Sequence, residues 1–203
     1  MDNKATDISA EAIAKCHGKM IILTAPSGAG KSSIAHYLLT KHADKLAFSV
    51  SATTRAPRGL EKDGVDYYFI SADTFRENIL KEAFLEWEMV YEGKYYGTLK
   101  SELNRIWNSG KLPIMDIDVK GAIHVRKQFG AECLSIFIQP PSVQDLEQRL
   151  KGRGTETPES IQTRLNKAKY ELSFQPHFDQ TVINDQLDTA CRQAEKLILD
   201  FIG

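Results

Sequence analysis

Features that would place this chain outside the ordinary globular class are scarce. The 203 residues include only three cysteines, Cys16, Cys133 and Cys191, which are far apart and lack metal-ligand spacing, so we expect reduced thiols. No apolar run approaches the ~20 residues that a membrane-spanning helix needs. Residues 1–19 contain no apolar stretch typical of a secretory signal. These absences predict a cytoplasmic protein without a membrane partner.

The chain also has no excess charge of either sign. Its 26 Lys and Arg residues and 27 Asp and Glu residues give a formal net charge of -1. A general nucleic-acid binder needs a strong positive field, so we expect no nucleic-acid partner, although a local basic cluster that holds a small anion stays open. The length suits one sizeable domain, or a core with small insertions. The sequence is compatible with a homo-oligomer, but no sequence feature indicates one.

Short apolar runs alternate with helical patterns along most of the chain. Such runs are typical of strands buried on both faces of a parallel sheet. Four of them predict strands: MIILT (20–24), LPIMDI (112–117), SIFI (135–138) and TVIN (181–184). Helices are expected after residue 30, after Asp118, after a Ser142 cap, after a Thr157 cap, and from Leu187 onward. This alternation predicts an α/β fold with a parallel sheet flanked by helices.

The stretch from 48 to 103 breaks that rhythm. It is rich in Thr, Tyr, Phe, Gly and charged residues, and it predicts a strand at 65–71, a helix at 72–84 and a hairpin at 85–98 with its turn near Glu92 and Gly93. We interpret it as an inserted mixed α/β lobe. Residues 1–17 are expected to form a loose N-terminal tail, with a short helix capped by Ser9 as an option.

The segment APSGAGKSS follows the first predicted strand and opens the first predicted helix. Gly28 and Gly30 permit backbone angles that aim N–H groups at phosphate oxygens, Lys31 reaches the β- and γ-phosphates, and the Ser32 hydroxyl ligates Mg²⁺. Ala25 stands where the pattern has its first glycine, and we expect the loop to form if the φ of Ala25 stays in a region that alanine tolerates. The predicted ATP-binding residues are Ala25, Pro26, Ser27, Gly28, Ala29, Gly30, Lys31, Ser32 and Ser33.

The segment IMDID ends another predicted buried strand. Asp116 is expected to hold Mg²⁺ or its waters, because ligands of parallel-sheet folds bind beyond the carboxyl ends of the strands. The alternative for Asp116 or Asp118 alone is an aspartate that caps the next helix.

Two groups of arginines suggest further phosphate sites. Arg55 and Arg58 lie in SATTRAPR, and Tyr67, Tyr95 and Tyr96 of the same lobe offer hydroxyl groups to the same anion. Arginine suits forked, charge-assisted binding to phosphate. The alternative is a solvated arginine pair on the surface.

The second arginine group surrounds KGRGTETPES. Arg149, Arg153 and Arg164 flank a glycine-containing loop between two predicted helices, a layout that suits stabilisation of charge in phosphoryl transfer. Two separate cationic sites indicate transfer from a nucleoside triphosphate to a phosphorylated acceptor. That acceptor is already anionic, so no general base is needed, and the five histidines form no evident catalytic constellation.

Taken together, these motifs resemble the guanylate kinase family of P-loop kinases from about Lys19 to the C-terminus. The segments that carry the resemblance are APSGAGKSS, FSVSATTRAPRGLEKDGVDYYFIS, FLEWEMVYEGKYYGT, MDIDVKGA, IFIQPPSVQDLEQRLKGRGTET and VINDQLD. Two departures are Ala25 and the tail before His17, which the shortest members lack.

The resemblance implies ATP-dependent phosphorylation of GMP to GDP in purine nucleotide metabolism, by in-line transfer with Mg²⁺. It implies a P-loop NTPase core (18–47, 104–141 and 174–203), a GMP-binding lobe (48–103) and a helical and loop lid (142–173). Lys31 and the lid arginines Arg149, Arg153 and Arg164 become the catalytic residues, and Asn184 matches the adenine side. The implied GMP-binding residues are Ser51, Arg55, Arg58, Tyr67, Glu86, Tyr96, Thr98 and Asp118.

Glu86 is expected to read the base. Guanine offers N1–H and an exocyclic amine as adjacent donors for one carboxylate, whereas adenine would leave a buried carboxylate unpaired. The alternative is an exposed strand glutamate. Two other functions stay open: a non-catalytic binding module of the same fold, and a related P-loop kinase with another phosphorylated acceptor.

Overall fold

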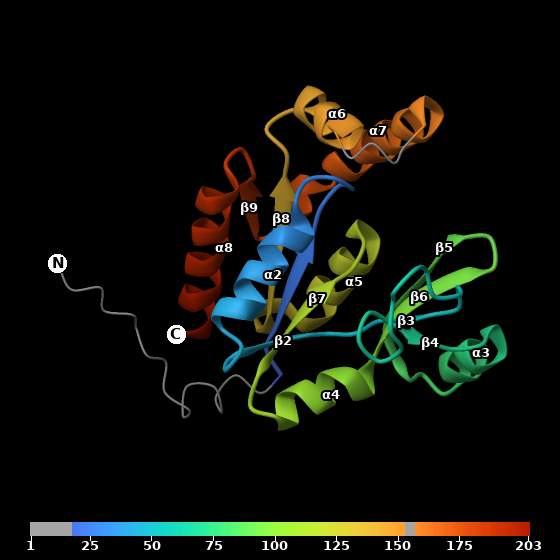
Figure 1. Ribbon diagram of the computed structural model, residues 1–203. Coiled ribbons are helices and arrows are strands. Elements are labelled where there is room, and N and C mark those ends of the chain that lie inside the picture. Colours follow the sequence, from blue (N-terminus) through green and yellow to red (C-terminus); the bar gives the residue numbers. More distant parts are fainter. Residues whose placement is uncertain (1–17, 153–156) are drawn as a thin grey trace.

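A five-stranded parallel sheet forms the centre of the molecule (Figure 1). The computed structural model describes residues 18–152 and 157–203. The strand order is β2-β7-β1-β8-β9, so the first strand in the chain lies in the middle of the sheet. The strands are β1 (Met20–Thr24), β2 (Leu46–Phe48), β7 (Leu112–Asp116), β8 (Cys133–Gln139) and β9 (Gln180–Ile183).

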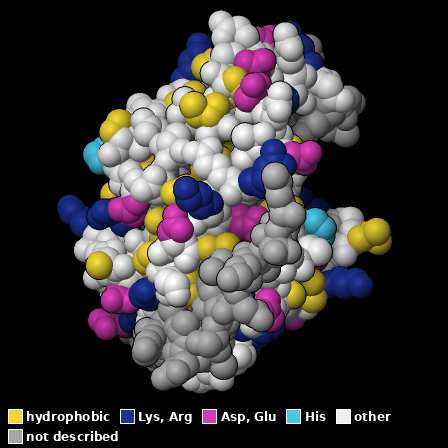
Figure 2. All heavy atoms as spheres, turned by 90° about the vertical axis from the view of Figure 1, so that its left-hand side faces the viewer, with side chains coloured by type: hydrophobic (Ala, Val, Ile, Leu, Met, Phe, Trp, Pro, Cys, Tyr) yellow, Lys and Arg dark blue, Asp and Glu magenta, His cyan; other side chains and the backbone are white. Residues whose placement is uncertain are grey.

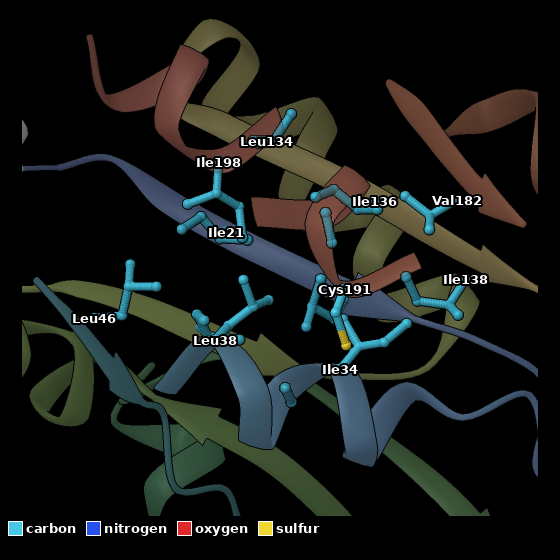
Figure 3. Packing of buried hydrophobic residues seen from close by; sticks show 14 of the residues in the cluster. Ile21, Ile34, Leu38, Leu46, Leu134, Ile136, Ile138, Val182, Cys191 and Ile198 are labelled. Carbon is cyan, nitrogen blue, oxygen red and sulfur yellow. The ribbon is translucent and has the colours of Figure 1, made fainter. Parts of the chain in front are cut away.

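Helices cover both faces of this sheet. On one face, α2 (Lys31–Lys41) and α8 (Leu187–Ile202) pack against the strands. Figure 3 shows Ile34 and Leu38 of α2 and Ile198 of α8 gathered beside Ile21 of the central strand, and all four are at most 1% exposed. On the other face, α4 (Lys100–Asn108) and α5 (Val119–Phe129) cover the sheet. The predicted α/β fold with a parallel sheet between helices is confirmed.

The four strands expected from apolar runs are present, but two core elements were missed. β2 has only three residues, LAF, and this apolar run is too short to mark a strand. α4 carries just Leu103 and Ile106 as buried apolar residues in a polar sequence. The boundary that we placed between residues 103 and 104 falls inside this helix.

The inserted lobe contains a separate four-stranded sheet with the order β4-β3-β6-β5. The predicted hairpin is confirmed, and its turn contains Gly93 with a φ of 69°. The strand predicted at 65–71 is limited to Tyr68–Phe69, and the predicted helix ends at Leu80. The lobe elements are β3 (Ala52–Thr53), β4 (Tyr68–Phe69), α3 (Ala72–Leu80), β5 (Phe84–Tyr91) and β6 (Lys94–Leu99).

Two further helices, α6 (Val143–Gly152) and α7 (Pro158–Leu172), lie beyond the end of β8 (Figure 1). Both predicted caps are confirmed, because the Ser142 hydroxyl accepts from the backbone of Asp145 at 3.0 Å and the Thr157 hydroxyl accepts from Ser160 at 3.3 Å. Short 3₁₀ helices span Gly130–Glu132 and Gln175–His177. Arg153 and the tail at 1–17, with its Ser9 cap, lie outside the described residues.

The surface and the cysteines agree with the composition. Figure 2 shows Lys and Arg side chains interspersed with Asp and Glu on the face that bears α8. In the part of the chain that is described, no helix is long and apolar enough to span a bilayer. Cys133 and Cys191 are free and buried, as expected of reduced thiols.

Candidate functional site

A cleft of about 400 Å³ brings together residues from the core, the lobe and α7. It joins the phosphate loop to the lobe, where Tyr67 and Tyr96 line the same space. Its lining residues are Ala25, Pro26, Ser27, Gly28, Gly30, Lys31, Ser32, Ser33, Ser51, Tyr67, Glu86, Glu88, Tyr96, Gly97, Asp116, Ile117, Asp118 and Glu171.

The phosphate loop has the backbone that its sequence predicts. Gly28 and Gly30 have φ values of 94° and 95°, a region that residues with a Cβ rarely adopt. Among the described residues other than glycine, only Glu82 has a positive φ. The φ of Ala25 therefore lies in a region that alanine tolerates, as expected. α2 starts at Lys31 with no acidic residue in its first turn. No carboxylate of the helix itself therefore offsets the positive end of its dipole, which faces the cleft.

Neighbouring elements hold this loop in place. The buried Asn184 side chain donates from Nδ2 to the carbonyl of Ala29 at 2.8 Å. A Cβ on Gly28 would lie 3.0 Å from Leu146 of α6, so that helix packs closely on the loop. Ala29 itself is fully buried and does not line the cleft. Asn184, expected on the adenine side, contacts the phosphate loop through its side chain.

Lys31 and Asp116 form an ion pair at the floor of the cleft. Burial lowers the pKa of the Lys31 ammonium to about 8, and the carboxylates of Glu171 and Asp118 act in the opposite direction. The hydroxyl of Ser32 and the carboxylate of Asp116 both line this space. Mg²⁺ commonly binds through few protein oxygens together with waters and substrate phosphates, so this donor set fits Mg²⁺.

Glu171 is a cleft residue that the sequence reasoning missed. It is only 7% exposed, its Oε2 has no hydrogen-bond partner among the described residues, and burial raises its pKa. A signal was available, because Glu171 follows Arg164 by seven residues on a predicted helix, which places both on one face.

Glu86 lies in the lobe wall of the cleft, on β5. The Thr98 hydroxyl of β6 donates to Glu86 Oε1 at 2.7 Å, across paired positions of the hairpin. Burial raises the pKa of Glu86 to about 7, the nearby Asp118 and Glu88 carboxylates add to the shift, and the Thr98 hydrogen bond opposes it. Glu86 is therefore not a fully exposed strand glutamate, and it retains capacity to accept further hydrogen bonds.

The first turn of α5 closes the space beside Glu86. A Cβ on Gly121 would lie 2.9 Å from Glu86 Oε2, so glycine permits this close approach. Asp118 caps α5, and its Oδ1 accepts from the backbone N–H groups of Lys120 and Gly121 at 2.8 Å each. Asp118 also lines the cleft. It therefore caps the helix and belongs to the cleft wall at the same time.

The arginines of the lobe occupy different environments. Arg55 is buried, with its guanidinium over the rings of Tyr67 at 4.8 Å and Phe69 at 5.6 Å. Arg58 is exposed, and its backbone N–H donates to Glu61 Oε2 at 2.8 Å. Neither arginine lines the cleft directly, whereas Tyr67 and Tyr96 do.

The described lid arginines contact the core. Arg164 Nη1 donates to Ser27 Oγ of the phosphate loop at 2.8 Å. Arg149 Nη2 donates to the carbonyl of Asn184 at 2.7 Å. The helices of the predicted lid thus touch the phosphate loop and the adjoining C-terminal segment.

Comparisons with known proteins identify the family of this chain. The family model described as guanylate kinase matches residues 17–200. A guanylate kinase of Bacteroides fragilis is 51% identical over 185 residues, covering 91% of this chain and 90% of the relative. One from Porphyromonas gingivalis is 48% identical, with 91% and 98% covered. The crystal structure of guanylate kinase from Anaplasma phagocytophilum has a TM-score of 0.71 at 29% identity, covering 92% of this chain and 87% of that one.

Proposed function

This chain belongs to the guanylate kinase family and is an enzyme that phosphorylates GMP with ATP, and we propose that the described cleft is where it does so. The observation that carries the assignment is the shared cleft, in which the phosphate loop and the Glu86 carboxylate line one space of about 400 Å³. A nucleoside triphosphate bound at one end and a guanine nucleotide at the other would bring their phosphates together.

On the acceptor side, Glu86 takes the guanine base. As a carboxylate it accepts from N1–H and the exocyclic amine, while the Thr98 hydroxyl holds it in orientation at 2.7 Å. Ser51 and Asp118 stand nearby in the cleft wall. Arg55, Arg58, Tyr67 and Tyr96 supply the positive charge and hydroxyl groups for the GMP phosphate.

On the donor side, the loop from Ala25 to Ser33 binds the ATP phosphates through its backbone N–H groups. Lys31 leaves Asp116 for the phosphates when ATP enters, which frees the carboxylate of Asp116. Ser32 and Asp116 would hold Mg²⁺, which would neutralise phosphate charge. Asn184 contributes to the adenine side and keeps the loop in its binding conformation.

Transfer itself rests on positioning and electrostatics. The acceptor oxygen of GMP is already anionic, so the protein has no proton to remove before in-line attack. Lys31 and the lid arginines Arg149, Arg153 and Arg164 stabilise the charge that spreads over the transferred group. Arg164 already contacts the phosphate loop through Ser27, close to this charge. A non-catalytic binding module is not favoured, because Lys31 and Ser32 of the loop are intact.

ADP release from ATP and Mg²⁺ tests the proposal, with GMP, AMP, dTMP and UMP offered separately. We expect strong turnover with GMP alone. Turnover with another acceptor would retain the phosphate sites and reject Glu86 as the base reader. No turnover with folded protein would favour the binding module. A cytoplasmic location stays a prediction.

A further inference from the structure

Glu61, which no sequence pattern singled out, holds the guanidinium of Arg55. Arg55 Nη1 donates to Glu61 Oε2 at 2.6 Å, and Nη2 donates to Oε1 at 2.7 Å. The pair is therefore bidentate, with the carboxylate at the far end of the fork. The Arg55 side chain is only 7% exposed, compared with 24% for Glu61.

Glu61 accepts only some of the N–H groups of Arg55. A guanidinium has five N–H groups in fixed positions. Glu61 takes one from each terminal nitrogen, and the carbonyl of Ala56 takes the second from Nη1 at 3.0 Å. The N–H on Nε and the second N–H on Nη2 lie along the same edge of the plane, and Arg55 also interacts with the hydroxyls of Tyr67 and Tyr96. Nε is buried and has no hydrogen-bond partner within the described ranges.

Aromatic rings surround the Arg55 guanidinium and connect it to the cleft. The rings of Tyr67 and Phe69 cover the guanidinium at 4.8 and 5.6 Å, and Tyr96 meets Tyr67 edge to face with ring centroids 5.9 Å apart. Tyr67 and Tyr96 line the cleft, so the guanidinium adjoins the space where the acceptor binds. A buried donor without a partner is costly, and an entering phosphate oxygen would satisfy it.

We propose that Glu61 is a positioning residue, which holds Arg55 end-on so that the edge with Nε and Nη2 receives the phosphate of the acceptor. The inference rests on the proposed function in taking that phosphate to be the one of GMP. The alternative is that Glu61 competes with the phosphate for Arg55, so that the phosphate must displace the Glu61 carboxylate. Three donors hold Glu61, namely both terminal nitrogens of Arg55 and the backbone N–H of Arg58 at 2.8 Å, so displacement would break three charge-assisted hydrogen bonds.

Steady-state kinetics of Glu61→Gln test this role. The amide cannot accept both N–H groups of Arg55, so we expect the KM for GMP to rise about tenfold, with kcat and the KM for ATP within about twofold. Glu61→Asp keeps the charge and should recover part of the loss. The matched control is Glu77→Gln, an exposed lobe glutamate on α3 that pairs weakly with Lys81 at 3.5 Å, and it should leave all three constants unchanged.

A double-mutant cycle with Arg55→Met decides whether Glu61 acts through Arg55. In that background, Glu61→Gln should add no further rise in the KM for GMP, and an equal rise in both backgrounds would overturn the inference. An unchanged KM in the single variant would also overturn it, and a lower KM would identify Glu61 as a competitor. Failure of the wild type to use GMP would reject the proposed function instead. Calorimetric binding of GMP to the same variants would then decide the role of Glu61.

Discussion

The two sides of the cleft present different kinds of group. On the core side, consecutive residues present backbone N–H groups, and the unusual angles fall on Gly28 and Gly30. On the lobe side, the groups are side chains from paired strands, with Glu86 on β5 and Thr98 on β6. A phosphate site therefore depends on one local segment, whereas choice of base depends on strand register and burial.

The largest expected effect comes from removing the Lys31 ammonium on the core side of the cleft. In Lys31→Met, the transferred phosphoryl group loses a positioned charge, and we expect kcat to fall by about 10³-fold. GMP binding, measured by calorimetry, should change little because the lobe is untouched. The control is Lys196→Met, which removes an exposed lysine from α8 and should leave kcat as it was. A Lys31 variant with near wild-type kcat would contradict the assigned role.

The next largest effect is expected from removing the Glu86 carboxylate on the lobe side. Glu86→Gln places an amide donor against the guanine donors, so we expect kcat/KM for GMP to fall about 100-fold while the KM for ATP stays constant. Glu88→Gln is the matched control, since Glu88 lies two residues along the same strand and also lines the cleft. Equal losses in the two variants would mean that the general negative charge of this wall matters, and not pairing with the base.

The core side was largely predictable from the sequence. A continuous apolar run such as Met20–Thr24 favours a buried strand, and glycines at 28 and 30 before Lys31 leave few structures other than a phosphate loop. The ion pair between Lys31 and Asp116 was not predicted, since the two residues meet only because β1 pairs with β7.

The lobe side was predictable in its elements but less so in its contacts. The hairpin followed from alternating residues around Glu92 and Gly93. The pairing of Glu86 with Thr98 depends on strand register, and two irregularities in the β5–β6 ladder shift that register. Glu61 was missed because its partner Arg55 is brought to it by a loop whose folding no periodic pattern marks.

The KM for GMP is expected to depend on pH through Glu86 on the lobe side. Burial, with Asp118 and Glu88 nearby, raises the pKa of Glu86 to about 7, so protonation below that pH removes the carboxylate that guanine needs. At pH 6 only about one-tenth of a group with that pKa is ionised, so we expect the KM for GMP to rise about tenfold between pH 8 and pH 6.

The GMP phosphate titrates near pH ~6 as well, and the Glu86→Gln variant separates the two groups. The variant keeps the contribution of the phosphate and loses that of Glu86, so its KM should vary less with pH. Identical profiles for the wild type and the variant would show that Glu86 does not titrate in this range.

The smallest effect concerns Gly121, where core and lobe meet. Alanine is a better helix former than glycine by about 1 kcal/mol, so Gly121→Ala in α5 should not lower the melting temperature. Its Cβ would lie 2.9 Å from Glu86 Oε2, however, and the carboxylate must move away. We expect the KM for GMP to rise about fivefold from that displacement. In a Glu86→Ala background no carboxylate is left to displace, so Gly121→Ala should change the KM no further. A persistent effect there would mean that Gly121 acts on the cleft by a route other than Glu86.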